Sequence, residues 1–198
     1  MYDVSYTTHM RTQLNRYVDW AWGVMAIVWL IGAIRTKPTA RSQSAASRVV
    51  HIALLGAAFV MMFGRVPLGP LDLAMFPESA MIAYGGLALV VAGVALAIWA
   101  RFMLGGNWSA SVTIKDHHTI TRSGPYRMVR HPIYSGILLG LLGTALVQNR
   151  VRQFIGLVLV FIAMWTKLQI EEQFLERQFG PEYLEYKRNV RALIPFVL

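Results

Sequence analysis

Five long apolar runs, separated by short polar segments, constrain the fold of this chain more than any other feature of its sequence. They cover residues 18–34, 49–63, 80–100, 133–147 and 151–170 of 198. A membrane-spanning helix needs about 20 apolar residues, and tilt or packing against neighbouring helices relaxes that length. Only 15% of the residues are charged, whereas a soluble domain carries about 25%. The sequence therefore predicts an all-α integral membrane protein with five transmembrane helices.

The polar breaks between the runs predict how the second half is organised. Only residues 148–153 separate the fourth and fifth runs, which favours a tight antiparallel helical hairpin. The fifth run is purely apolar only over residues 154–165, so we expect it to continue as an amphipathic helix past Lys167. Gly180 followed by Pro181 marks a helix end and a new helix start. After it we expect a short cytoplasmic helix with Tyr183, Tyr186 and Val190 on one face.

The distribution of lysine and arginine predicts an orientation in the membrane. With five spans, one side carries Arg11, Arg16, Arg65, Arg150 and Arg152, and the other side carries the remaining fourteen of the nineteen basic residues. Cytoplasmic segments carry the excess of positive charge. We therefore expect the N-terminus outside and the C-terminus in the cytoplasm, with no cleaved signal peptide. The same bias explains the net charge of +9 without a nucleic-acid partner.

Two clusters of ionisable residues border the fourth and fifth runs. The segment SGPYRMVRHPIYSG, residues 123–136, places Arg127, Arg130 and His131 directly before an uncharged stretch, and a second cluster of Lys167, Glu171 and Glu172 ends the fifth run. Charge beside a hydrocarbon-length segment is costly, so such groups usually bind a ligand or pair with each other. Lys167 and Glu171 are spaced i, i+4 and could form a simple ion pair. Their place at the end of a span favours a functional site at the membrane face.

Other motifs narrow the function. The glycines at positions 136, 140 and 143 would let another helix approach the fourth run closely. The chain has no cysteine, no GxGxxG and no P-loop, which excludes thiolate chemistry and phosphate binding by a glycine turn. His117 and His118 are adjacent and no HExxH is present, so no metal site is expected. His9 and His51 are interpreted as incidental.

The motifs of the second half, taken together and in order, resemble the isoprenylcysteine carboxyl methyltransferase family and its relatives among the phospholipid methyltransferases. The matching residues are GNWSASVTIKDHHTITRSGPYRMVRHPIY, 106–134, and EEQFLERQFGPEYLEYKRNVRALIPF, 171–196. The resemblance covers about the last hundred residues. The length of the chain suits a single membrane domain over residues 1–198. Hydropathy alone assigns the three N-terminal spans to residues 1–100, and the resemblance implies a cofactor-binding and catalytic region with two spans in 101–198.

The resemblance also implies a membrane-bound, S-adenosylmethionine-dependent methyltransferase without a Rossmann fold, releasing S-adenosylhomocysteine. Glu171 matches an acidic residue on the acceptor side, and Lys167 stands where the prenylcysteine enzymes usually have arginine. The resemblance, with the charge of the cofactor, implies these cofactor-binding residues: His118, Thr119, Ile120, Thr121, Tyr126, Arg130, His131, Pro132, Ile133, Tyr134 and Glu172.

The chemistry of these residues agrees with that reading. The cofactor carries a carboxylate, an ammonium and a sulfonium, so Arg130 and His131 can hold the carboxylate while Glu171 or Glu172 faces the ammonium. A carboxylate acceptor is already ionised at pH 7 and needs no general base, so alignment and exclusion of water would supply most of the catalysis. Lys167 and Glu171 are the predicted catalytic residues. The predicted partners are membrane lipids and a lipophilic methyl acceptor reaching the site sideways between helices.

Two alternatives remain open at the level of sequence. Membrane sterol or enone reductases, which use NADPH, share a histidine-proline-x-tyrosine segment, but they usually have more spans. A non-enzymatic membrane interaction protein would leave the ionisable residues around the hairpin unexplained. The acceptor itself, an acid, an amine or a thiol, is not fixed, and neither are the oligomeric state and the role of the first three spans. A bacterial or archaeal member of the family could methylate an acceptor other than prenylcysteine.

Overall fold

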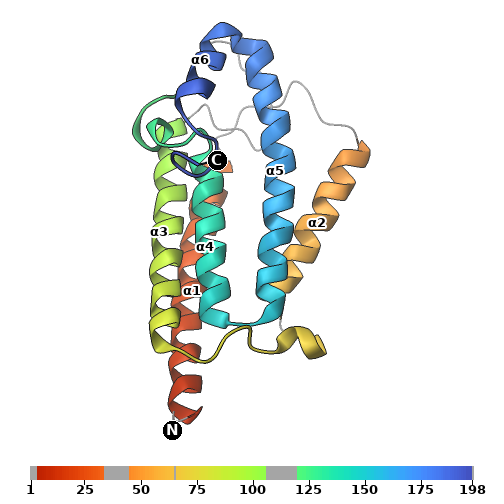
Figure 1. The fold of residues 1–198 in the computed structure, drawn as a ribbon, viewed down its shortest axis with the longest axis vertical. Helices are drawn as coiled ribbons and strands as arrows, with labels where there is room; N and C mark the ends of the chain where they lie inside the picture. Colours follow the sequence, from red (N-terminus) through yellow and green to blue (C-terminus); the bar gives the residue numbers. More distant parts are fainter. Residues whose placement is uncertain (1–3, 34–44, 65, 106–119, 198) are drawn as a thin grey trace.

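The computed structural model describes residues 4–33, 45–64, 66–105 and 120–197, and its described part is helical without a β-strand. Three long α-helices precede the segment 123–131, and three more α-helices follow it (Figure 1). In chain order the elements are α1 (Val4–Ala33), α2 (Ala45–Phe63), the 3-10 helix η1 (Gly69–Asp72), α3 (Ala80–Leu104), the 3-10 helix η3 (Gly124–Arg127), α4 (Pro132–Gln148), α5 (Val151–Phe179) and α6 (Pro181–Asn189).

The helices form a bundle in which α1, α3 and α4 pack together and α5 joins α4 to α2 (Figure 1). One apolar cluster includes Val18 of α1, Val90 of α3 and Val147 of α4. A second connects Ala58 and Met62 of α2 with Val160 of α5. Helix α2 leaves this contact and leans away from α5 toward the end of the bundle that holds α6 (Figure 1).

Small residues allow α3 and α4 to lie in backbone contact. A Cβ atom added at Gly93 of α3 would overlap the backbone of Gly136 and Gly140 in α4, and one added at Gly143 would overlap that of Gly86 and Val90. No side chain larger than hydrogen fits at these positions without moving a helix. The close approach expected from the spacing of the glycines in α4 is therefore confirmed, and α3 is the partner helix.

The turn between α4 and α5 confirms the predicted antiparallel hairpin. Asn149 ends α4 in the left-handed conformation, with φ of 53°. Its side chain donates to the carbonyl of Phe76 at 2.8 Å and accepts from the Phe76 amide at 3.0 Å. Next to it, Arg152 pairs with Asp72 of η1 at 3.1 Å. This end of the bundle is thus closed by contacts between the hairpin turn and the loop before α3.

The C-terminal helices follow the sequence-based expectation with one correction. Helix α5 continues past Lys167 without a break to Phe179, and Gly180 separates it from α6. Tyr183 and Tyr186 are buried on one face of α6. Val190 was expected on the same helical face, but it follows α6 in extended conformation, because the chain turns there toward α4. Helix α1 begins at Val4, well before its apolar run, so its first half is a polar extension.

Among the described helices, α3 and α5 are long and apolar enough to cross a membrane. Helix α4 is apolar but shorter, with 17 residues, and the apolar part of α2 covers only His51–Phe63. Helix α1 carries Arg11, Arg16 and Asp19 in its first half. Each predicted apolar run thus forms a helix, and the count of five spans remains a prediction.

Candidate active site

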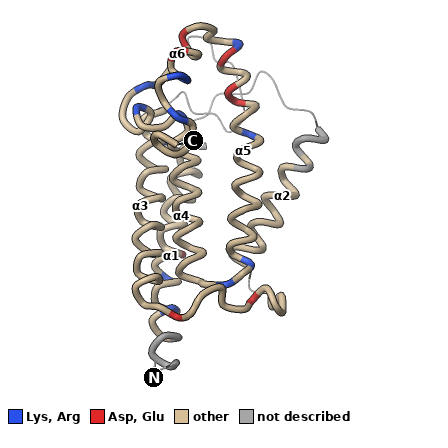
Figure 2. The backbone as a smooth tube through the Cα atoms, viewed as in Figure 1, with Lys and Arg blue, Asp and Glu red and all other residues tan. Residues whose placement is uncertain are grey.

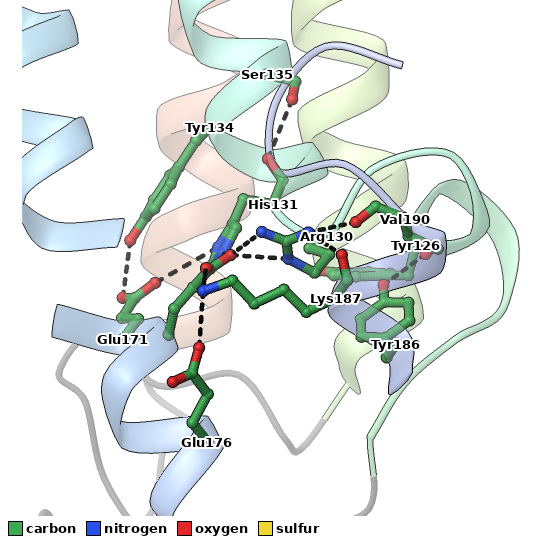
Figure 3. Close-up of polar contacts among 11 residues, drawn as sticks. Tyr126, Arg130, His131, Tyr134, Ser135, Glu171, Glu176, Tyr186, Lys187 and Val190 are labelled. Carbon is green, nitrogen blue, oxygen red and sulfur yellow. Dashed lines mark hydrogen bonds and ion pairs between the residues drawn. The ribbon is translucent and has the colours of Figure 1, made fainter. Parts of the chain in front are cut away.

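The hairpin brings Arg130 and His131 of the first ionisable cluster against Glu171 and Glu172 of the second (Figure 3). Arg127, which the sequence placed in the first cluster, is exposed and, among the described residues, has no recorded ion pair with them. Pro132 begins α4, so Arg130 and His131 lie just before its first turn, and Glu171 and Glu172 lie in the last third of α5. Because α4 and α5 run antiparallel, the start of one helix meets the end of the other. The prediction that these residues share one site is consistent with this geometry.

The innermost contact is a buried ion pair between Arg130 and Glu172. The Nε atom of Arg130 donates to Glu172 at 2.7 Å, and the two side chains are only 7% and 4% exposed. Lys187 of α6 contacts the other carboxylate oxygen of Glu172 at 2.8 Å and also binds Glu176 at 2.7 Å. These hydrogen bonds raise the pKa of the Lys187 ammonium above its ordinary value. The buried charges are therefore compensated.

Arg130 also fixes the chain that follows α6. Its Nη1 atom donates to the carbonyl oxygens of Lys187 and Val190. The backbone adds two hydrogen bonds, from Arg130 to Arg191 at 2.8 Å and from His131 to Ala192 at 2.9 Å. Residues 190–193, which we call the C-terminal strap, therefore lie against the start of α4. Most donors of Arg130 are used in holding this strap and Glu172.

A second, more accessible layer consists of His131, Tyr134, Lys167 and Glu171. His131 lies between the two glutamates, with Nε2 at 3.3 Å from Glu172 and Nδ1 at 3.7 Å from Glu171. The Tyr134 hydroxyl donates to Glu171 at 2.8 Å, and its ring stacks on that of His131. Lys167 lies 3.9 Å from Glu171 and 5.8 Å from the centre of the Tyr134 ring. Lys167 and Glu171 are 27% and 22% exposed, so they can meet a ligand.

The remaining predicted site residues make no polar side-chain contact with this cluster in the described part of the chain. Tyr126 is buried beside α3, where its hydroxyl donates to the carbonyl of Ala100 and its own carbonyl accepts from Tyr186 at 2.5 Å. Burial raises the pKa of Tyr186 to about 12. Ile120 and Thr121 lie half-buried at the start of the segment leading to η3, and Pro132 and Ile133 form the first turn of α4. His118 and Thr119 lie outside the described residues.

His51 of α2, interpreted from sequence as incidental, lies near Lys167. Gly156 of α5 contacts Met62 of α2, and Ala58 packs in one cluster with Val160. The two helices are antiparallel, so continuing along each by seven residues from Ala58 and Val160 brings His51 level with Lys167. The ammonium of Lys167 is close enough to act on the charge of the His51 imidazole. No periodic pattern in the sequence predicts this pairing, because it depends on how α2 packs on α5.

The cluster is one of ion pairs and hydrogen bonds. Within the described parts of the chain, no three histidine or acidic side chains come together as metal ligands. Around His131, the cations Arg130, Lys167 and Lys187 are matched in number by the anions Glu171, Glu172 and Glu176. A ligand that carries both a carboxylate and an ammonium can exchange with such pairs without leaving an unpaired charge.

Comparison with known proteins identifies the class to which this fold and site belong. Residues 81–182 match the model of the phospholipid methyltransferase family. The chain is 32% identical over 129 residues to a probable protein-S-isoprenylcysteine O-methyltransferase of Oryza sativa subsp. indica, covering 62% of this chain and 68% of that protein. It is 30% identical over 132 residues to protein-S-isoprenylcysteine O-methyltransferase B of Arabidopsis thaliana, covering 64% of this chain and 67% of that one.

Two further similarities extend the comparison. The cobalt-zinc-cadmium resistance protein CzcN of Cupriavidus metallidurans is 34% identical over 111 residues, which cover 55% of this chain and 49% of that protein. The solved structure of the eukaryotic intramembrane Ras methyltransferase ICMT is similar with a TM-score of 0.57 and 21% identity. That match covers 79% of this chain and 55% of the other, and it supports the fold.

The fold and the relatives together define a helical membrane methyltransferase. The chain belongs to the phospholipid methyltransferase family and, within it, groups with the isoprenylcysteine carboxyl methyltransferases. The two plant relatives and the solved structure are named as methyltransferases, which favours a methyltransferase over the reductase and the non-enzymatic protein considered from the sequence.

Proposed function

We propose that this methyltransferase uses S-adenosylmethionine to methylate the carboxylate of a lipophilic acceptor of the prenylcysteine type. The observation that carries the proposal is the position of Lys167. Its ammonium lies beside Tyr134 and Glu171, partly exposed, at the point where the apolar part of α5 gives way to the polar cluster. A cation at this boundary suits an acceptor with an anionic head and an apolar tail. The names of the plant relatives support the same acceptor class.

The side chains of the accessible layer fit the cofactor. Glu171 offers a carboxylate to an ammonium, the imidazole of His131 offers a hydrogen bond to a carboxylate, and the ring face of Tyr134 suits a sulfonium. The cofactor supplies an electrophilic methyl group. Arg130 and Glu172 support this layer from behind, because their mutual ion pair fixes His131 against the strap.

The residues on the acceptor side act by position and charge. Lys167 holds the acceptor anion, and the surrounding apolar helices exclude water from it. His51 of α2 adds a second polar group on this side, level with Lys167 along the two helices. Lysine offers a single point of charge where a guanidinium would grip both carboxylate oxygens, so the acceptor keeps more freedom to rotate. No general base is needed, because the acceptor is ionised at neutral pH.

We further propose that α1 to α5 all cross the membrane, with the N-terminus outside and the active site in the cytoplasm. The two ends of the bundle differ in charge as this orientation requires. The hairpin turn and η1 lie at one end, and α6 lies at the other, where most of the described Lys and Arg positions are found (Figure 2). The lipophilic acceptor then reaches the site from the bilayer, while the cofactor comes from the cytosol.

Titration of the purified protein with S-adenosylhomocysteine and with NADPH tests this proposal. We expect heat of binding and a rise in melting temperature with S-adenosylhomocysteine and neither with NADPH. Methyl transfer from radiolabelled S-adenosylmethionine to a farnesylated cysteine, compared with the same molecule as its methyl ester, then tests the acceptor. Binding without transfer to the free acid would reject the carboxylate acceptor, and a response to NADPH alone would reject the cofactor.

A further inference from the structure

An open groove of about 390 Å³ lies beside the C-terminal strap, and no described residue of the active-site cluster other than the strap lines it. It is lined by Arg127 and Met128 at the end of η3, by Arg188 and Arg191 around the end of α6, and by Phe196. The three arginines are exposed. Within the part of the chain that the structure describes, no ion pair is recorded for their guanidinium groups, whereas Arg122 and Arg130 nearby are paired with glutamates.

Apolar side chains surround the same groove. Met128 is 57% exposed and Phe196 is 95% exposed, and Ile194 and Val197 next to them are more than half exposed. Large apolar side chains this accessible are costly in water and stable in contact with lipid. The groove thus combines strong positive charge with an apolar rim.

The strap fixes the level of this groove along the helices. The Ser135 hydroxyl in the first turn of α4 donates to the carbonyl of Leu193 at 2.6 Å. Ala192 and Leu193 are buried against Leu168 of α5. The chain therefore returns from α6 to the level where the apolar part of α4 begins (Figure 1). In a membrane protein, that level is the boundary between headgroups and acyl chains.

We propose that this groove binds an anionic phospholipid, with its phosphate held by Arg127, Arg188 and Arg191 and its acyl chains along Met128 and Phe196. Guanidinium groups bind phosphate oxygens by paired, charge-assisted hydrogen bonds. Basic side chains next to an apolar rim match the layering of headgroup and acyl chain at a membrane surface. The bound lipid would fasten the strap, and through Arg130 it would steady Glu172 and His131. This inference depends on the membrane location of the protein and is independent of the methyl acceptor.

The test uses the full-length protein in neutral detergent with phosphatidylglycerol or phosphatidylcholine added. We expect phosphatidylglycerol to raise the melting temperature and phosphatidylcholine to leave it unchanged. Each basic side chain at an anionic lipid surface contributes roughly fivefold in affinity. The double variant Arg127→Gln/Arg188→Gln should therefore bind phosphatidylglycerol about 25-fold more weakly. Arg191 is left in place, because its carbonyl anchors the strap.

A matched control and a soluble probe make the result specific. Arg16→Gln/Arg177→Gln removes the same charge from two exposed arginines outside the groove and should keep the wild-type affinity. Native mass spectrometry counts bound lipids directly if the melting temperature does not respond. If both double variants lose the same affinity for phosphatidylglycerol, the effect comes from net charge alone and the proposed site is wrong. An equal response to glycerol phosphate would mean a site for free phosphate, and no preference for phosphatidylglycerol would also overturn the proposal.

Discussion

Single residues in the candidate site divide into those that hold the chain in place and those that a ligand can reach. Arg130 and Glu172 are almost fully buried and bind each other, whereas Lys167 and Glu171 keep about a quarter of their surface exposed. The sequence assigns Arg130 and Glu172 directly to the cofactor. In the structure their charges are already compensated, so we expect them to act mainly as positioning residues.

Replacing Glu172 should therefore destabilise the protein before it affects chemistry. Glu172→Gln leaves Arg130 buried without its counterion, which costs about 3–5 kcal/mol in known cases. We expect a large fall in the melting temperature, measured in detergent without ligand. Glu182→Gln breaks the exposed pair with Arg122 and should cost less than about 1 kcal/mol. Equal stability of the two variants would show that Glu172 is not a structural counterion.

Lys167 should behave in the opposite way. Lys167→Met removes the cation that we assign to the acceptor, so turnover should fall strongly while the affinity for S-adenosylhomocysteine stays within a few-fold. Lys167→Arg should retain activity on a carboxylate acceptor, because the guanidinium can bind both oxygens. Parallel calorimetry and initial-rate measurements separate the two effects. If cofactor affinity falls as steeply as turnover in Lys167→Met, Lys167 belongs to the cofactor pocket.

At the scale of helices, two helix pairs differ in how closely they pack: α3 with α4, and α2 with α5. Helices α3 and α4 are held at backbone distance by glycines, and this rigid pair presents His131 and Tyr134. Helix α2 packs on α5 at one end and leans away at the other (Figure 1). In the proposed mechanism, the tight contact would fix the residues on the cofactor side, and the divergent pair would leave the acceptor side open to the bilayer.

The tight contact can be tested with a single added methyl group. Gly93→Ala places a Cβ against the backbone of Gly136 and Gly140 and should destabilise the protein by about 1–3 kcal/mol. Gly85→Ala lies in the same helix with no atom within 4 Å of the new Cβ. It should be neutral or stabilising by up to about 1 kcal/mol through helix propensity. Thermal unfolding of the two variants decides the matter, and similar melting temperatures would contradict the glycine contact.

The open side can be tested through α2. His51→Phe keeps an apolar helix but removes the polar group level with Lys167, so we expect the KM for the acceptor to rise several-fold. The affinity for S-adenosylhomocysteine should not change. His9→Phe, at an exposed position of α1, serves as the control and should match the wild type. If His51→Phe leaves the KM for the acceptor unchanged, His51 has no role in acceptor binding.

At the scale of the whole molecule, the bundle has two chemically distinct ends. One end holds the hairpin turn, closed by Asp72 and Arg152, and the other holds the active-site cluster, the strap and α6. This polarity agrees with the bias of basic residues in the sequence, and in the topology that we propose the active-site cluster lies on the cytoplasmic side.

The orientation can be measured directly, because the chain has no cysteine of its own. Leu73→Cys introduces a thiol at an exposed position after η1, and Glu185→Cys introduces one at an exposed position of α6. In intact cells, a membrane-impermeant maleimide should label position 73 and should reach position 185 only after permeabilisation. The reverse pattern would invert the proposed topology, and labelling of both from outside would reject it.

The sequence by itself determined which segments are helical, where the hairpin lies and which residues carry charge at its open end. These features depend on hydrophobic runs, turn residues and spacing within a single segment, which are local properties. The same local character explains the extension of α5 past Lys167 and the break at Gly180.

Only the tertiary structure decided how these segments use their side chains. The pair of Arg130 with Glu172 joins residues 42 positions apart, and the strap joins the end of the chain to the start of α4. The electrostatic effect of Lys167 on the His51 imidazole depends on the packing of α2 on α5. A sequence pattern records that a residue is polar or small, but its partner is set by the packing of distant helices, which no local spacing encodes.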